Sequence, residues 1–164
     1  MARYDRIARL EPPQRDDAFT GWLAVRDLEG RERDTDLARR ARLRFLAVRL
    51  IHRLIRRGSD LDRDSLQQQC DTVREELGQL PSRDPERERL AGFLKEVTTL
   101  DMATIVRATL GLADAARAEG HPFAAEEFYR TAVALAERHD LGTLRSEGVQ
   151  GLAALDREPA PTGA

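Results

Sequence analysis

The sequence predicts an all-α fold, an antiparallel array of about seven helices with a repeat-like C-terminal part. Composition is the first reason: the chain is 41% hydrophobic but only 5% aromatic, so Leu, Ala, Val and Ile must supply the core. Periodicity is the second, because apolar residues recur at helical spacing in segment after segment and no alternating strand pattern occurs. Glycines and prolines fall mostly between these segments, where they begin or end helices.

The length of 164 residues fits one domain. We expect residues 1–157 to form a single helical domain, with N-terminal helices over 14–97. A repeat-like hairpin and a capping helix are expected over 102–156. The tail over 158–164 has no apolar pattern and is expected to be disordered.

The first helix is expected over about 14–28, after Pro12 and Pro13. Proline is tolerated in a first helical turn because no hydrogen bond is lost there. Trp22 falls on the apolar face of this helix, and Gly30 begins the turn that follows.

The strongest periodic pattern predicts a helix over about 36–57, which Gly58 can end in a left-handed conformation. At about 100° per residue, one broad face is apolar. It holds Leu43, Ala47, Leu50, Ile51, Leu54 and Ile55. Arginines gather on the other face within about 100° of arc. They are Arg39, Arg42, Arg49, Arg53, Arg56 and Arg57.

Acidic residues that can cap helices mark the next boundaries. Asp60 and Asp62 precede a helix expected over about 62–78. Asp84 and Pro85 supply the cap and the first-turn proline of a helix that runs to about residue 97. The expected inward residues of the earlier helix are Leu66, Cys70, Val73 and Leu77.

Three helices are expected in the remainder of the chain. Asp101 can cap a helix over about 102–119, and after Gly120 Pro122 opens a helix to about residue 139. Gly142 precedes a last helix over about 143–156. Its expected apolar face consists of Leu144, Val149, Leu152, Ala153 and Leu155.

Small residues recur in the segment 102–139 where two helices would touch. The pattern comprises Leu112 and Ala113 in the first helix, Gly120 at the turn, and Ala125, Tyr129 and Ala132 in the second. It resembles a tetratricopeptide repeat, a helix–turn–helix unit in which small residues let the helices approach and an aromatic fills the groove between them. The resemblance implies a protein-binding scaffold, with the last helix in the place of a capping helix. Because one repeat cannot bury its own faces, the other helices are either degenerate repeats or a bundle packed against this hairpin.

Charge is heavy but balanced, with 27 basic and 29 acidic residues and a net charge of −2. A chain with this balance is not, as a whole, a binder of nucleic acid or of anionic membranes. Lys95 is the sole lysine, and we attribute the excess of arginine mainly to a high-GC, bacterial-type coding bias. Cys70 is the sole cysteine, so no internal disulfide can form and a reducing compartment is expected.

The N-terminus carries charges where a signal peptide needs an apolar run. No segment approaches the roughly 20 consecutive apolar residues that cross a bilayer. We therefore expect a cytoplasmic protein without a membrane partner.

The arginine face of the helix over 36–57 is the strongest candidate for a functional surface. We expect Arg42, Arg49, Arg53 and Arg56 to pair with acidic groups of a protein or peptide. On the repeat-like hairpin, Arg107, Glu126 and Arg130 are candidate polar contacts. The competing interpretation is a solvated face, neutralised by neighbours that include Asp60, Asp62, Asp64, Glu75, Glu76, Glu86 and Glu88.

Patterns for chemistry are weak, so we expect no enzyme, no cofactor and no metal. Asp60, Asp62 and Asp64 faintly resemble the start of a calcium loop, but Ser65 stands where its sharp turn needs glycine. The histidines lack zinc-site spacing, Cys70 falls on an inward face, and no glycine-rich phosphate loop occurs.

The leading hypothesis is a non-catalytic scaffold or adaptor that binds a protein or peptide in a groove between helices. The alternative is a nucleic-acid-associated regulator that binds phosphates through the arginine face. A third hypothesis is a homo-oligomer formed through an exposed apolar face.

Overall fold

The computed structural model describes residues 35–57 and 62–157, except for the side chains at 35–38, 41 and 57. All secondary structure within these residues is helical, which confirms the predicted fold class. The helix expected over 14–28, with Trp22, and the tail over 158–164 lie outside the described residues. The six helices are α3 (Thr35–Arg57), α4 (Arg63–Leu77), α5 (Pro85–Val97), α6 (Met102–Ala118), α7 (Pro122–Arg138) and α8 (Gly142–Arg157).

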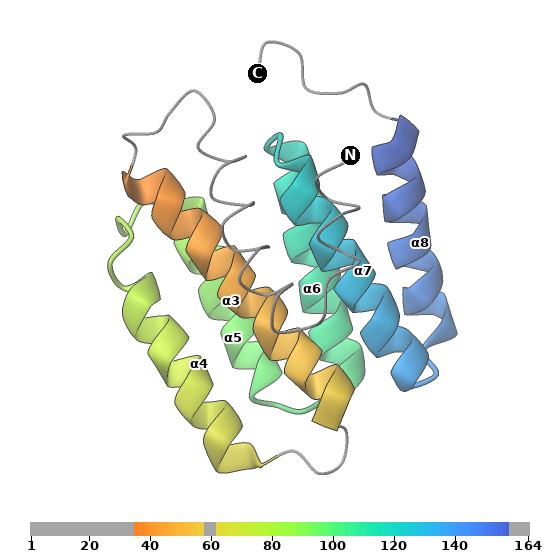
Figure 1. The fold of residues 1–164 in the computed structure, drawn as a ribbon, viewed down its shortest axis with the longest axis horizontal. Helices are drawn as coiled ribbons and strands as arrows, with labels where there is room; N and C mark the ends of the chain where they lie inside the picture. Colours follow the sequence, from red (N-terminus) through yellow and green to blue (C-terminus); the bar gives the residue numbers. More distant parts are fainter. Residues whose placement is uncertain (1–34, 58–61, 158–164) are drawn as a thin grey trace.

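Consecutive helices run antiparallel, and they form two groups of three (Figure 1). Helices α3, α4 and α5 pack on one another, as do α6, α7 and α8. The groups meet where α3 crosses α7 and where α5 lies beside α6. Helices α4 and α8 therefore form the two outer edges of the molecule (Figure 1). A single cluster of buried apolar side chains extends through both groups.

The predicted caps set the helix boundaries. The side chains of Asp62, Asp84 and Asp101 accept hydrogen bonds from first-turn backbone N–H groups of α4, α5 and α6. Each cap satisfies a donor that has no partner within the helix. Gly120 lies in the turn between α6 and α7 and has a φ of 82°. Glycine adopts this left-handed conformation without a steric penalty.

Small residues allow α6 and α7 to form the most extensive helix–helix contact in the described chain. Ala113 on α6 and both Ala125 and Ala132 on α7 are fully buried. Tyr129 of α7 is also buried, and its hydroxyl donates to the carboxylate of Asp114 on α6. This hydrogen bond satisfies the one polar atom of a side chain that otherwise fills apolar space.

The packing face of α8 differs from the predicted one. Val149 was expected inward, but it is 42% exposed, and Ala153 is exposed as well. Gly148 and Gly151 occupy the buried face instead, because their missing side chains let α8 approach α7 closely. A Cβ added at Gly148 would lie 2.6 Å from Cγ2 of Val133, and one at Gly151 would collide with the ring of Tyr129.

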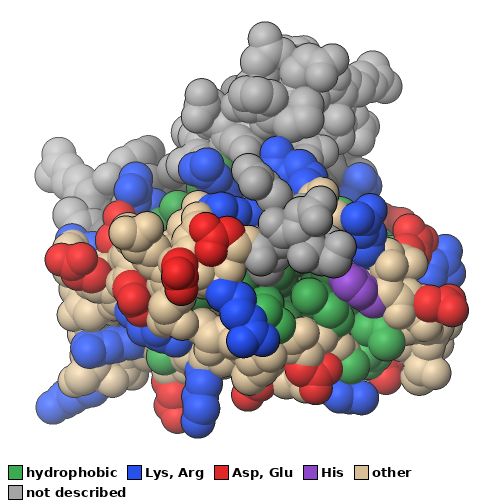
Figure 2. Space-filling model, turned by 90° about the horizontal axis from the view of Figure 1, so that it is seen from below, with side chains coloured by type: hydrophobic (Ala, Val, Ile, Leu, Met, Phe, Trp, Pro, Cys, Tyr) green, Lys and Arg blue, Asp and Glu red, His purple; other side chains and the backbone are tan. Residues whose placement is uncertain are grey.

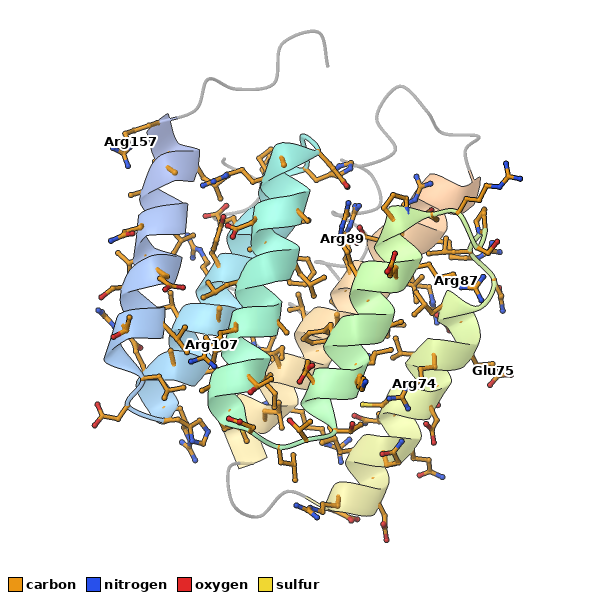
Figure 3. All side chains as sticks on the ribbon, turned by 180° about the vertical axis from the view of Figure 1, so that it is seen from behind. Arg74, Glu75, Arg87, Arg89, Arg107 and Arg157 are labelled. Atoms are coloured by element: carbon orange, nitrogen blue, oxygen red, sulfur yellow. The ribbon has the colours of Figure 1, made fainter. Side chains whose placement is uncertain are left out.

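A buried ion pair joins α3 to α5. Arg44 is 1% exposed, and its Nε donates to Oε1 of Glu86 at 2.9 Å. The other oxygen of Glu86 accepts from Arg89, one turn further along α5, at 3.1 Å. Arg89 in turn donates to Glu119, just after α6, and so extends the network to the second group of helices (Figure 3).

Arg40 makes a second link between the same two helices. Its Nε donates to Oδ2 of Asp84 at 2.6 Å, while Oδ1 of Asp84 caps α5. Sequence reasoning did not single out either Arg40 or Arg44. The signal was present, since Arg44 lies three and seven residues before Ala47 and Ile51 and so shares their apolar face.

We expect Gly151→Ala to lower the free energy of unfolding by about 1–3 kcal/mol, because the added methyl group overpacks the contact with Tyr129. Gly111→Ala is the matched control. Nothing lies within 4 Å of the Cβ position at Gly111, an exposed residue of α6. This control should raise the free energy of unfolding by about 0.5–1 kcal/mol. Urea unfolding followed by circular dichroism measures both, and equal effects of the two substitutions would contradict the close packing of α8.

We expect Glu86→Leu to lower the free energy of unfolding by about 3–5 kcal/mol, because it leaves Arg44 buried without this carboxylate. The double variant Arg44→Met/Glu86→Leu should recover most of the loss, since it removes both charges. The same urea experiment checks this. Arg44→Met alone completes the cycle. A double variant whose loss of stability equals the sum for Arg44→Met and Glu86→Leu would show that the two charges are not coupled.

Candidate partner-binding groove

A groove with a volume of about 660 Å³ lies between α3 and α4. Four arginines of α3 line it, and we call them the groove arginines: Arg42, Arg49, Arg53 and Arg56. All four belong to the predicted arginine face. Between them lie the apolar side chains of Leu46, Leu50 and Val73.

Burial of the rest of α3 determines where the groove arginines lie. Side chains on a wide arc of this helix pack against α4, α5 and α7, including Phe45 and Val48 beside the predicted apolar face. At about 100° per residue, the groove arginines fall within about 60° of arc on the remaining side. The groove arginines therefore lie on the side of α3 that borders α4, where their charges stay in contact with solvent.

One end of the groove is neutralised. Nε and Nη2 of Arg42 donate to the two carboxylate oxygens of Glu76, each at 3.0 Å. This is a bidentate pair, the strongest geometry for a guanidinium and a carboxylate. Nearby, Arg39 donates to the backbone carbonyl oxygen of Gln79 at 3.2 Å. We call this region the paired end.

The other end carries positive charge that no lining carboxylate offsets, and we call it the open end. Arg53 donates to the hydroxyl of Ser65, a neutral acceptor, at 2.7 Å. The guanidinium of Arg49 lies 5.9 Å from the ring centroid of Phe45, a cation–π distance. Within the described part of the chain, neither Arg49 nor Arg56 pairs with a carboxylate.

The open end places like charges one turn apart on α3. Arg49 and Arg53 are four residues apart, and Arg56 follows three residues later. Each such pair destabilises a helix by about 0.2–0.5 kcal/mol when no opposite charge intervenes. An anionic ligand would offset this repulsion.

No acidic residue of α4 lines the open end, because Glu76, the carboxylate among the lining residues, lies at the paired end. At the open end α4 contributes Gln69 and Thr72 to the groove. Asp71 faces solvent, where it pairs with Arg74 at 3.0 Å. Glu75 is exposed as well, and Figure 3 labels it at the outer side of α4.

The wider surface has no comparable concentration of one charge in the view of Figure 2. Acidic and basic side chains are interspersed over that face, with apolar side chains between them (Figure 2). A mixed surface of this kind produces little long-range field. On that face, therefore, neither sign of charge predominates.

The candidate residues of the hairpin do not join the groove. Arg107 is exposed on α6 (Figure 3). Hydrogen bonds from Thr104 lower the pKa of Asp101, the N-cap of this helix, and the charge of Arg107 adds to that shift. Arg130 pairs with Glu126 on α7 at 2.8 Å. Burial raises the pKa of Glu126, and the charge of Arg130 opposes that shift. The side chain of Arg57, also part of the predicted face, lies outside the described residues.

The other polar side chains considered as candidates bond to residues of the protein itself. His52 lies 3.2 Å from Glu127 across the contact between α3 and α7. Asp62, from the faint calcium-loop pattern, caps α4, and Asp71 on that helix accepts hydrogen bonds from Gln67 and Arg74. Within 35–57 and 62–157, no group of three or more His, Cys, Asp or Glu side chains is placed to hold a metal ion.

Comparison with family models, curated proteins and solved structures found no match for this chain. Among the described helices, none combines the length and the apolar character needed to span a membrane.

Cys70 is fully buried on α4, and burial raises the pKa of its thiol. A raised pKa keeps the thiol protonated at neutral pH, and the protonated form is a poor nucleophile. We therefore expect the native protein to react with a disulfide reagent such as DTNB only at the rate of unfolding or local opening. Absorbance in native buffer and in urea measures the two rates. Fast reaction of the native protein would contradict the burial of this residue.

Proposed function

We propose that this protein is a non-catalytic adaptor or scaffold that binds an acidic segment of a partner protein in the groove between α3 and α4. The observation that carries the proposal is the arrangement of the groove arginines around an apolar floor. Carboxylates of the partner would pair with guanidinium groups, and its apolar side chains would cover Leu46, Leu50 and Val73.

The ion pairs and the apolar contacts would contribute differently to binding. Exposed ion pairs add little affinity each, but they accelerate association and exclude basic partners. Burial of apolar side chains in the floor supplies affinity that persists at high salt. Arginine suits this role better than lysine, because its planar fork of donors fits a carboxylate with two hydrogen bonds.

The α6–α7 hairpin adds support from the second group of helices. It buries the small residues Ala113, Ala125 and Ala132 and the aromatic Tyr129, the residues that carry the resemblance to a tetratricopeptide repeat. Proteins of that family hold protein partners, so a repeat-like scaffold agrees with an adaptor. We place this function in the cytoplasm, because the sole cysteine excludes an internal disulfide.

Affinity capture from a lysate of the source organism tests the proposal, with and without nuclease. The groove variant is Arg49→Glu/Arg53→Glu. Its control is Lys95→Glu/Arg138→Glu, which changes the net charge equally at two exposed residues outside the groove. We expect a partner protein that resists nuclease and is retained by the control but is lost from the groove variant.

Three outcomes would contradict this proposal. Nucleic acid in the eluate, with every protein lost after nuclease, would favour the regulator, whose binding should also fall steeply with salt. Retention of the same partners by the groove variant would place the binding surface elsewhere. Capture of the chain by itself, with a mass that rises with concentration, would favour the homo-oligomer.

A further inference from the structure

We propose that the occupant of the groove is an acidic amphipathic helix, with its carboxylates at the open end and its apolar side chains over the floor. This inference rests on the proposed function and specifies the form and register of the partner. Two features of the groove carry it, its shape and its uneven charge.

The shape of the groove excludes the other common modes of peptide recognition. A strand-forming peptide needs an exposed sheet edge, and the described residues contain no strand. A polyproline segment needs an aromatic-lined groove, but no aromatic side chain lines this one. A seam between two antiparallel helices, with apolar residues along its floor, fits the remaining mode, in which a helix lies in a groove.

The dimensions agree with a helix. The groove arginines extend from Arg42 to Arg56 along α3, which is about 21 Å of helix axis or about four turns. Leu46 and Leu50 are four residues apart and so project from successive turns on one side. Val73 faces them from α4. A partner helix with apolar residues at three- and four-residue spacing can pack between these side chains.

The spacing of the charges favours carboxylates over a single phosphate. Arg49, Arg53 and Arg56 follow one another at four and three residues, so their charges are spread over about two turns. A partner helix with acidic residues at the same spacing presents one carboxylate to each guanidinium. A single phosphate would need the guanidinium groups to converge on one point, yet the hydrogen bond to Ser65 directs Arg53 toward α4.

The uneven charge of the groove determines the register of the partner helix, that is, which of its ends lies at the open end. At the paired end, the donors of Arg42 that face Glu76 are already satisfied, and an added carboxylate would meet the charge of Glu76. At the open end, Arg49 and Arg56 have no carboxylate among the described residues. The acidic residues of the partner must therefore be concentrated toward one end of its helix.

Two fluorescein-labelled peptides of about 18 residues test the inference, because a helix of this length spans about 27 Å. One has an apolar stripe at helical spacing and glutamates concentrated in one half. The other has the same composition in an order that removes the stripe. Fluorescence anisotropy with the full-length protein gives the affinities, and circular dichroism reports whether the bound peptide becomes helical.

We expect the striped peptide to bind at least about tenfold more tightly than the scrambled one and to gain helix on binding. Arg53→Gln/Arg56→Gln should weaken its binding about tenfold, since two ion pairs are lost. The control Lys95→Gln/Arg138→Gln makes the same change of net charge at two exposed residues outside the groove, and its effect should stay below about twofold. Thermal unfolding of each variant shows whether the fold is retained.

Each other outcome overturns a defined part of the proposal. Equal affinities of the two peptides would overturn the helical occupant and leave the acidic-partner adaptor in place. Equal effects of the two double variants would overturn the pairing of the partner's carboxylates with the open end. Binding of a single-stranded oligonucleotide or of inorganic phosphate by a protein that binds neither peptide would remove both the helix and the adaptor.

Discussion

The buried ion pair between Arg44 and Glu86 is the constraint on which the arrangement of α3 depends. A buried charge without a partner is costly, so α3 can pack only in a rotation that brings Arg44 to Glu86 on α5. Arg40, one turn earlier, meets Asp84 in the same rotation. With that face held against α5, the groove arginines lie on the opposite side, along α4. The pairing that anchors the helix thus also determines which of its faces lines the groove.

Helix α7 organises the other half of the molecule by a different physical means. It contacts α3, α6 and α8, and small residues allow its close approach to α6 and α8. Alanines face α6, and two glycines of α8 lie against Val133 and Tyr129. Close packing of this kind gains dispersion contacts and leaves little freedom to shift. The α3–α4 seam is more open, and the groove occurs there.

Local patterns predicted most of the helices because local chemistry determines their ends. Asp62, Asp84 and Asp101 each cap the helix they were expected to cap, and Gly120 adopts the left-handed turn. The register of α8 was not predictable in the same way. Hydrophobicity placed Val149 inside, whereas the buried positions belong to Gly148 and Gly151. Glycine has no apolar side chain, so a hydrophobic pattern cannot show that it lies in a helix contact. The ring of Tyr129 against Gly151 gives the reason for a glycine at this position.

The sequence by itself determined that the chain is helical, where the described helices begin and end, and that one face of α3 is rich in arginine. These properties depend on spacing within a few turns, which the order of residues contains directly. Tertiary structure decided which arginines form ion pairs within the protein and which stay available to a ligand. Arg42 and Arg44 are two residues apart, yet one meets Glu76 on α4 and the other Glu86 on α5. Such pairings join residues more than thirty positions apart, and only the packing of whole helices brings them together.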